Sequence, residues 1–391
     1  MSTIEYLSYL LDAPRVEAFR RAIEATVRPG QVVLDLGTGI GTYAMFAARA
    51  GARVLAVEVD PVIEIARGLA ADNGLADRIT FLSGRVEALQ APERADVLIF
   101  EDFCAYLFHP ETAEILEDVG HRWLAAEALA IPQTIRVMLA PVCSQESHGA
   151  IAAWDEASPY GLDIRRFTRA VLNDLHAACW GPGVLLGEPF EVARVDPLSL
   201  APFGFDVAAR WNVEREGVLH GLGLWIDLEL AGGVSFSNRP SGRASGWNQM
   251  FLPVLEARRV RAGDVVEAQV ATLGSSPRRP QWWRWRVETG GDRQEMDTFR
   301  GVPLSLSRLR RAILDNRPAL TPRGQIRRAV LELMDGQRTV AEIAGALRQR
   351  FPQQLRRDAD GYQAVARELE AGTGEVPTGQ LDRPVGARLG R

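Results

Sequence analysis

Cysteine is scarce in this sequence of 391 residues, which contains only Cys104, Cys143 and Cys179. The three are widely spaced and form no Cys-x-x-Cys pair or histidine cluster, so neither a disulfide framework nor a bound metal is expected. No stretch approaches the roughly 18 apolar residues of a membrane span, and the N-terminal segment carries Glu5 and Asp12 where a secretion signal would be apolar. We therefore expect a cytoplasmic protein with no membrane partner.

An excess of positive charge is also absent. The 45 basic residues are outnumbered by 50 acidic ones, which gives a formal net charge of −5. Such a chain lacks the positive field that attracts nucleic acid, so a nucleic-acid partner is not expected. Because 47% of the residues are hydrophobic, the chain can form a sizeable core, and its length predicts two to three domains.

The first part of the chain alternates between helical and strand patterns. Apolar residues near helical spacing predict a helix over residues 1–28, which Pro29-Gly30 ends. The segments after it are predicted as strands over 31–36, 53–59, 79–82 and 96–100 and helices over 42–50 and 61–73. Strands that alternate with helices form a parallel sheet covered on both faces. Residues 1–140 are therefore predicted to be N-terminal helices plus a Rossmann-like α/β domain.

The pattern changes after residue 140. From Leu222 to Leu230 apolar residues alternate with other residues, as in a half-buried antiparallel strand, and two later segments repeat this. Residues 141–308 are therefore predicted to form a barrel-like β domain. Residues 309–372 contain three apolar helical stripes, with Gly336 after the first and a Thr339/Glu342 capping box before the second. The Gly- and Pro-rich segment 373–391 is predicted to be a disordered tail.

A glycine-rich turn follows the first predicted strand of the sheet. A backbone without β-carbons lets a ligand approach closely, and an acidic residue 21 positions after the first glycine, at the end of the next strand, suits the hydroxyls of a ribose. The spacing is GxGxG, one residue shorter than the form that binds a pyrophosphate. It favours S-adenosylmethionine as cofactor, with a dinucleotide as the alternative. The residues predicted to bind it are Asp35, Gly37, Gly39, Gly41 and Glu58.

Further motifs over residues 4–305 resemble those of the protein arginine methyltransferase family, bacterial members included. They are Asp12-Ala13-Pro14-Arg15 on the N-terminal helix, Gly84-Arg85-Val86-Glu87, Phe100-Glu101-Asp102-Phe103 after the fourth strand, and Ser245-Gly246-Trp247-Asn248-Gln249. The resemblance implies that Arg15 binds the cofactor carboxylate and that Val86 and Glu87 bind the adenine. It also implies a Rossmann-like methyltransferase domain followed by a barrel, and S-adenosylhomocysteine as the product.

Two departures concern the acceptor side of the site. The family's two loop glutamates are nine residues apart, whereas Glu111 follows Glu101 after ten residues, and Gly246 replaces the family's loop histidine. Both glutamates are predicted as the catalytic pair. A guanidinium has no free lone pair and is not readily deprotonated, so a carboxylate pair that gathers its positive charge is the plausible device. Asp102 is the alternative partner of Glu101, and His109 is a candidate base.

Other aromatic residues border the predicted acceptor pocket. Tyr6 and Tyr9 resemble the family's N-terminal lid, although aromatic residues on an amphipathic helix also serve as core. Trp247 is predicted as barrel core that also contacts the substrate. The alternating tryptophans at 282, 283 and 285 favour packing over base stacking. Family resemblance further implies that residues 160–180 form an arm that closes a homodimer.

The last helical module is similar to the peptide-binding winged helices of pyrroloquinoline quinone biosynthesis, over about 60 residues around Leu333–Ile343. Such modules bind leader peptides, which implies a peptide substrate; a helical cap or dimer contact is an equal alternative. We predict an N-methyltransferase acting on a peptide or protein, with arginine as the leading acceptor. The alternatives are the N-terminal amine of a ribosomally made natural-product peptide and, from another class, a non-catalytic peptide-recognition subunit.

Overall fold

The computed structural model describes residues 3–101, 111–152, 159–199, 204–240, 247–276, 279–303, 305–307, 310, 315 and 317–372. The chain divides into two compact units, Met1–Pro303 and Leu304–Arg391, each with a hydrophobic core of its own. Within the described ranges, none of the helices combines the length and the apolar character that a bilayer crossing requires. The larger unit contains three sheets and carries the predicted site.

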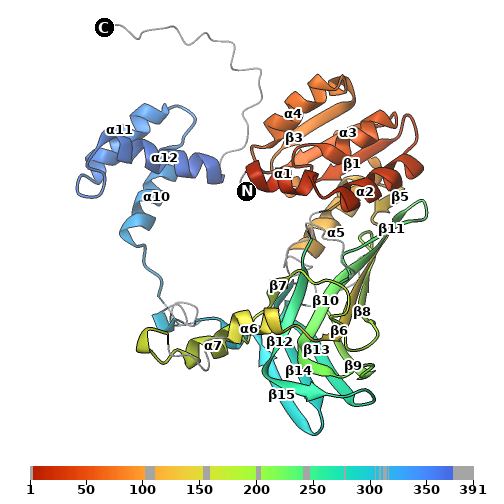
Figure 1. Ribbon diagram of the computed structural model, residues 1–391. Coiled ribbons are helices and arrows are strands. Elements are labelled where there is room, and N and C mark those ends of the chain that lie inside the picture. Colours follow the sequence, from red (N-terminus) through yellow and green to blue (C-terminus); the bar gives the residue numbers. More distant parts are fainter. Residues whose placement is uncertain are drawn as a thin grey trace. The chain divides into compact units, whose positions relative to one another are not determined.

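The first domain is built on a five-stranded parallel sheet with the order β3-β2-β1-β4-β5. Its strands are β1 (Val32–Leu36), β2 (Arg53–Glu58), β3 (Ile79–Ser83), β4 (Ala95–Phe100) and β5 (Leu124–Ile131). Its helices are α1 (Thr3–Leu10), α2 (Ala13–Thr26), α3 (Thr42–Arg49), α4 (Ile63–Asp72) and α5 (Thr112–Arg122), with short turns η1 (Ala76–Arg78) and η2 (Val86–Ala88). Figure 1 shows α3 and α4 beside the sheet. The predicted α/β domain is confirmed, and the chain order reverses between β1 and β4, where ligands bind in such sheets.

The N-terminal helix is interrupted, which corrects the prediction of a single helix over residues 1–28. α1 ends at Leu10, and α2 begins at Ala13 with Pro14 in its first turn. A proline lacks the N–H that a continuous helix would need there, so the chain breaks at Leu11-Asp12 and restarts. The break lets α1 lie in a different direction from α2, which packs against α3 and the barrel.

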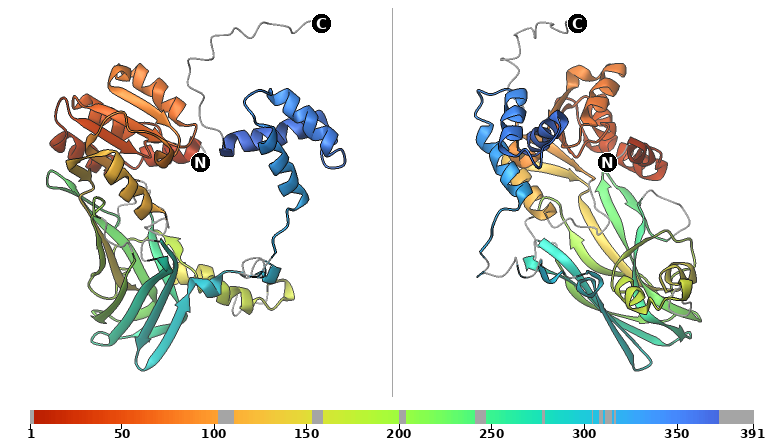
Figure 2. Two further views of the ribbon diagram at one scale, coloured as in Figure 1. Left: turned by 180° about the vertical axis from the view of Figure 1, so that it is seen from behind. Right: turned by 90° about the vertical axis from the view of Figure 1, so that its left-hand side faces the viewer.

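Two antiparallel sheets form the second domain and face each other (Figure 2). The larger sheet has the order β7-β12-β10-β6-β8, with β11 beside β10, and the smaller has the order β15-β14-β13-β9. The larger sheet contains β6 (Thr134–Val142), β7 (His176–Ala178), β8 (Phe190–Val195), β10 (Gly217–Ala231), β11 (Val234–Ser237) and β12 (Gln249–Val260). The smaller contains β9 (Asp206–Asn212), β13 (Val265–Ser276), β14 (Arg279–Thr289) and β15 (Asp292–Asp297). The predicted boundary at residue 140/141 thus falls inside β6.

Strand β10 is buried more completely than its alternating pattern suggested. Leu222, Leu224 and Ile226 face the main core as predicted, but Gly223 and Trp225 on the opposite face are buried too. A β-carbon at Gly223 would lie 2.8 Å from the Trp180 ring, so this face is covered by another segment of the same domain. The prediction of a half-buried strand is therefore wrong at these positions, because alternation reports the residue types and not what covers them.

Helical segments extend from the barrel between β6 and β7. They are α6 (Gln145–Ala152), η3 (Pro159–Gly161) and α7 (Arg165–Val171), and α8 (Thr298–Gly301) follows β15. Tyr160, Leu162 and Phe167 are exposed on this stretch, with Tyr160 96% exposed. Residues 160–180, which we call the arm, therefore present apolar side chains to solvent.

The second unit contains three described helices, α10 (Pro322–Leu333), α11 (Val340–Arg350) and α12 (Asp358–Gly372). The apolar faces of these helices pack together in a small core around Val330, Leu347 and Val365. The predicted capping box is confirmed, since Thr339 accepts from the Glu342 N–H and Glu342 accepts from the Thr339 N–H. Residues 317–372 contain these three helices and no strand, so the described part does not show the β wing of the predicted winged helix.

Candidate functional site

The carboxyl ends of β1, β2 and β4 open on a cavity of about 480 Å³. The predicted site residues that line it are Tyr6, Tyr9, Arg15, Gly37, Gly39, Glu58, Val86, Glu87, Glu101 and Glu111. Asp35, Gly41 and Trp247 are not among the described residues that line it. The predicted Asp102 and His109 fall outside the described residues. The structure thus brings the cofactor and acceptor predictions to one cavity.

The glycine turn has a backbone conformation that other residues rarely adopt. Gly37, Gly39 and Gly41 have φ angles of +77°, +55° and +82°. A β-carbon on Gly39 would lie 3.2 Å from the Tyr6 ring, and one on Gly41 would lie 3.2 Å from the β-carbon of Ala66. The second glycine therefore allows α1 to approach the turn, while the third allows α3 to pack closely on α4.

Glu58 is the acidic residue at the end of β2, and its carboxylate organises the turn. Its Oε2 accepts from Gly39 N at 2.9 Å, and its Oε1 accepts from the N–H groups of Val59 and Asp60, both at 2.8 Å. A carboxylate offers about four lone-pair sites. The three backbone bonds leave about one for a ligand hydroxyl, so binding both ribose hydroxyls would displace one backbone bond.

Asp35 does not line the cavity but stabilises the glycine turn from within the domain. It is 2% exposed and accepts a 2.6 Å hydrogen bond from the Thr38 hydroxyl. Burial raises the pKa of Asp35 to about 6, against the hydrogen bonds from Thr38 and the Ala44 N–H, while the nearby Glu58 charge raises it further. Asp35 therefore holds the turn and the start of α3 in place.

Arg15 is the link between the N-terminal helices and the loop after β4. Its guanidinium donates to the Glu101 carboxylate and to Tyr9 O (2.8 Å), and its Nε lies 3.4 Å from Asp12 Oδ2. The rings of Tyr9 and Trp247 lie 5.3 and 5.0 Å from its central carbon. Two aromatic rings and two carboxylates thus fix a cation that is 2% exposed.

Glu87 and Glu111 meet at a different part of the cavity. Arg85 donates to Glu87 Oε1 at 2.8 Å and to Glu111 Oε2 at 3.2 Å. Glu111 is the N-cap residue of α5. The two predicted catalytic glutamates therefore line the same cavity but hold different arginines, and Arg85 was not among the predicted site residues.

Tyr43 is another lining residue, and it belongs to none of the sequence motifs. It lies in α3, two residues after Gly41, and stacks on Phe19 with ring centroids 4.8 Å apart. Burial, followed by the Glu101 charge, raises the pKa of Tyr43 well above its ordinary value, so the hydroxyl stays protonated. Its place directly after the glycine turn is the signal that identifies it.

The cavity is electrostatically negative. Five carboxylates, those of Glu58, Asp60, Glu87, Glu101 and Glu111, line it with only two guanidiniums, those of Arg15 and Arg85. Such a site favours a ligand with positive charge. Among the described residues, no group of three or more potential ligands for a metal ion occurs. The arrangement suits a cationic cofactor, a cationic acceptor, or both.

Comparisons with known proteins match both domains of the larger unit. Residues 33–125 match the family model described as "Methyltransferase domain", and residues 133–281 match "Arginine methyltransferase oligomerization subdomain". The probable histone-arginine methyltransferase 1.3 of Arabidopsis thaliana is 27% identical over 267 residues, which cover 63% of this chain and 49% of the relative. Protein arginine N-methyltransferase PRMT10 of the same plant is 27% identical over 292 residues, 65% of this chain and 76% of the relative.

Solved structures share the fold. The Trypanosoma brucei PRMT1 enzyme-prozyme complex with AdoHcy has a TM-score of 0.67 and 21% identity, covering 75% of this chain and 97% of that one. Arabidopsis thaliana protein arginine methyltransferase 10 in an open conformation has a TM-score of 0.64 and 23% identity, covering 76% and 98%. The present chain spans about half the length of histone-arginine methyltransferase 1.3. Both domains are matched in the same order, so the larger unit is similar in sequence to methyltransferases, and in particular to arginine methyltransferases.

Proposed function

We propose that this protein is an S-adenosylmethionine-dependent N-methyltransferase that modifies arginine side chains of a peptide or protein. The observation that carries the proposal is the position of Glu101. Its carboxylate lies in a negatively charged cavity, at the carboxyl end of β4, and already contacts a guanidinium, that of Arg15. The similarity to arginine methyltransferases over both domains supports the same acceptor.

The cofactor is proposed to lie along the glycine turn. Glu58 accepts a ribose hydroxyl at its remaining lone-pair site, and Val86 and Glu87 hold the adenine. Arg15, which keeps N–H donors beyond those used in the structure, binds the cofactor carboxylate. S-adenosylmethionine supplies an electrophilic methyl group when bound, and no metal is needed. The negative cavity suits its sulfonium charge.

The acceptor guanidinium is proposed to bind at Glu101. Methyl transfer is an in-line displacement, so the nitrogen lone pair must point at the methyl carbon as charge leaves the sulfur. A carboxylate that gathers the positive charge onto one part of the guanidinium leaves another nitrogen richer in electrons. Glu111, held by Arg85 at 3.2 Å, faces the same cavity and supplies the second carboxylate, with Asp102 as the alternative. Tyr6, Tyr9 and Trp247 border the acceptor.

The remaining parts of the chain are proposed to bring the substrate and a second subunit to this site. The helical module 317–372 holds a segment of a peptide substrate, in the manner of the winged-helix modules that it resembles. Such a substrate would be a ribosomally made natural-product precursor. The exposed apolar side chains of the arm dock on a second copy and form a homodimer.

A matched set of peptides tests the proposal. The full chain is incubated with S-adenosylmethionine and peptides that differ only at one position, arginine or lysine, each with a free or acetylated N-terminus. We expect mass spectrometry to find methyl groups on arginine in both N-terminal forms, with stoichiometric S-adenosylhomocysteine. Methylation that disappears on acetylation would instead identify the N-terminal amine as acceptor. Absence of S-adenosylhomocysteine with every peptide would support a non-catalytic recognition subunit.

A further inference from the structure

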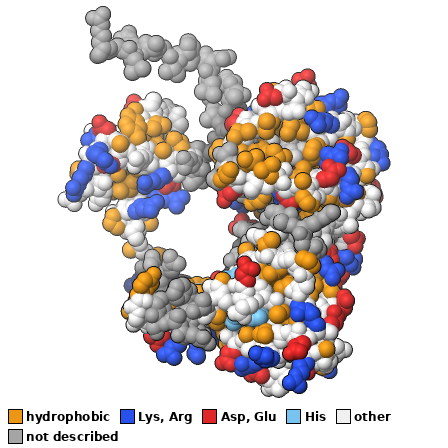
Figure 3. All heavy atoms as spheres, viewed as in Figure 1, with side chains coloured by type: hydrophobic (Ala, Val, Ile, Leu, Met, Phe, Trp, Pro, Cys, Tyr) orange, Lys and Arg blue, Asp and Glu red, His pale blue; other side chains and the backbone are white. Residues whose placement is uncertain are grey.

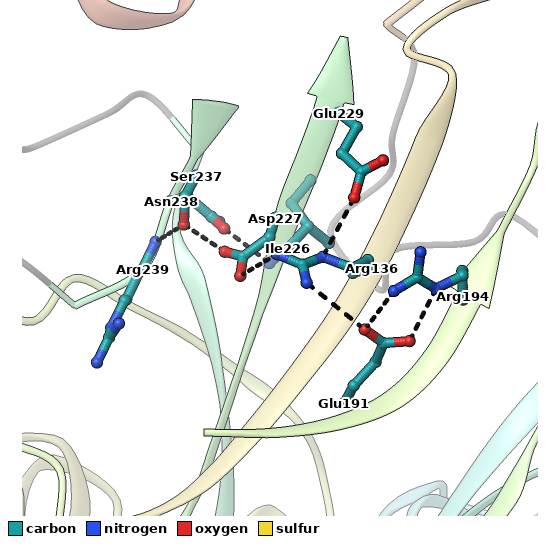
Figure 4. A network of polar contacts seen from close by, with 9 residues as sticks. All are labelled: Arg136, Glu191, Arg194, Ile226, Asp227, Glu229, Ser237, Asn238 and Arg239. Carbon is teal, nitrogen blue, oxygen red and sulfur yellow. Dashed lines mark hydrogen bonds and ion pairs between the residues drawn. The ribbon is translucent and has the colours of Figure 1, made fainter. Parts of the chain in front are cut away.

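Asn238 is a buried polar residue that no motif identified. It follows β11 directly, is 5% exposed, and precedes Trp247 by nine positions in the sequence. Its side-chain Oδ1 accepts from Ile226 N on β10 at 2.8 Å, and its own N–H donates to Ile226 O at 3.3 Å. Figure 4 shows this amide beside Ile226 at the edge of a polar network that includes Asp227, Arg136 and Glu191. Asn238 is therefore fixed to the central strand of the larger sheet.

The other end of the same amide holds the segment that carries Trp247. Asn238 Nδ2 donates to Asn248 O at 3.0 Å and to Trp247 O at 3.4 Å. One planar group thus accepts from β10 and donates to the backbone of Trp247 and Asn248. An amide is the side chain that offers an acceptor and two donors at this size. The contact joins the end of β11 to the residues that precede β12.

Trp247 in turn determines the surroundings of Arg15. Its ring packs edge-on against Phe236 of β11, with centroids 5.6 Å apart, and lies 5.0 Å from the Arg15 guanidinium carbon. Arg15 donates to the Glu101 carboxylate. A shift of Trp247 would remove one of the two rings that confine Arg15 and would change the position of Glu101.

A second buried amide connects this arrangement to the arm. Gln249 Nε2 donates to Asn238 O at 2.5 Å, and Gln249 Oε1 accepts from the backbone N–H of Trp180, the last residue of the arm, at 2.8 Å. The Trp180 indole donates to Ser147 of α6 at 2.9 Å. Buried and partly buried hydrogen bonds therefore run without interruption from the base of the arm to the segment that carries Trp247.

We propose that Asn238, supported by Gln249, is a positioning residue for methyl transfer: it holds Trp247 over Arg15 and thereby aligns Glu101. The inference rests on the proposed function, since Glu101 is assigned there to the acceptor. Asn238 touches neither cofactor nor acceptor. Cofactor affinity should change little on its substitution, because Tyr9 and Asp12 still hold Arg15.

The decisive variant is Asn238→Asp, which has the same size and keeps an acceptor for Ile226 N. It replaces the donor by an oxygen that faces Asn248 O at 3.0 Å, so the backbone at Trp247 and Asn248 is repelled. The matched control is Ser237→Ala, one residue earlier on the exposed face, which removes a hydroxyl that contacts Asp227 Oδ1 and Arg239 N but not Trp247. We expect Asn238→Asp to lower kcat on saturating arginine peptide tenfold or more, with S-adenosylhomocysteine affinity changed less than threefold, and the control to match wild type.

A spectroscopic measurement tests the placement without turnover. With 5-fluorotryptophan incorporated and the Trp247 signal assigned through Trp247→Phe, the ¹⁹F resonance of Trp247 should move in Asn238→Asp and stay in Ser237→Ala. If Asn238→Asp does not fold, Gln249→Glu replaces it, because glutamate keeps the acceptor for Trp180 N and loses only the donor to Asn238 O. An unmoved Trp247 resonance, or equal kcat losses in variant and control, overturns the inference. An inactive wild type contradicts the proposed function alone, since the fluorine spectra still decide whether Asn238 positions Trp247.

Discussion

Glu58 holds three backbone N–H groups before any ligand arrives, so it shapes the turn at which the cofactor is proposed to bind. We expect Glu58→Ala to weaken S-adenosylhomocysteine by about 1.5–3 kcal/mol, the value of hydrogen bonds to a charged acceptor. Calorimetric titration measures the change, with Glu64→Ala on the exposed face of α4 as control. Equal affinity in wild type and Glu58→Ala, or tight binding of NAD by the wild type, would contradict the cofactor assignment.

Glu101 and Glu111 differ in their surroundings, and this difference predicts unequal effects. Glu101→Gln removes the charge that is proposed to bind the acceptor, so the rate of methyl transfer should fall by about two to four orders of magnitude, or about 3–5 kcal/mol, at unchanged cofactor affinity. Glu111→Gln should lower the rate less. Glu111 lies at the start of α5, and its carboxylate already pairs with the exposed Arg85. Single-turnover kinetics with saturating cofactor separate the two. Near wild-type rates in both variants would mean that arginine is not the acceptor.

Asp35 makes stability depend on pH in a predictable direction. Its folded-state pKa is raised from an ordinary 3.8 to about 6, so its contribution is complete below pH 3.8 and is lost as the pH rises through 6. The full difference is about 3 kcal/mol. Asp35→Asn keeps an acceptor for Thr38, and should remove this loss of unfolding free energy between pH 4 and 7. Urea unfolding across that range, with exposed Asp77→Asn as control, measures it; parallel curves for wild type and Asp35→Asn would exclude the effect.

At the scale of helices and strands, local sequence patterns predicted where the strands lie better than which of their faces are buried by other segments. β1 to β4 lie where apolar runs and the glycine turn placed them, because a buried parallel strand needs such a run. The break at Leu11-Asp12 and the burial of Gly223 and Trp225 depend on packing against distant segments, which no local pattern reports. The same holds for the site: Arg15 and Glu101 were identified singly, while Arg85 and Asn238 emerged only from contacts across the fold.

The arm carries a prediction about assembly. Tyr160, Leu162 and Phe167 are exposed on it, and Figure 3 shows hydrophobic side chains gathered on the face of the first domain near α1, where Ile4, Leu7 and Leu11 are exposed. In a two-fold dimer, the arm of each copy would pack on the apolar surface near α1 of the other copy. Phe167→Ser should raise the dimer dissociation constant tenfold or more, since burial of an aromatic side chain contributes about 1.5–3 kcal/mol. Light scattering over a concentration series detects this, with exposed Arg166→Ser as control; a wild type that stays monomeric yet methylates would rule out the dimer.

At the scale of the whole molecule, the two units have separate cores, and this makes the role of the second one testable. The core around Val330, Leu347 and Val365 shares no residue with the core of the larger unit. A chain that ends near Asn316 should therefore fold and bind cofactor. If residues 322–371 hold a segment of the substrate, they raise the local concentration of the acceptor, often to about the millimolar range, and lower the apparent KM without changing the chemical step.

The shortened chain should then turn over a saturating short acceptor peptide at the normal kcat and lose tenfold or more in kcat/KM on the full-length substrate. Paired assays on the two substrates give this comparison directly, because only the longer one reaches the module. A shortened chain that is insoluble, or that no longer binds cofactor, would show that the module is a cap, since removal of the module would expose apolar surface on the larger unit. Unchanged solubility together with unchanged constants on both substrates would exclude tethering and capping alike.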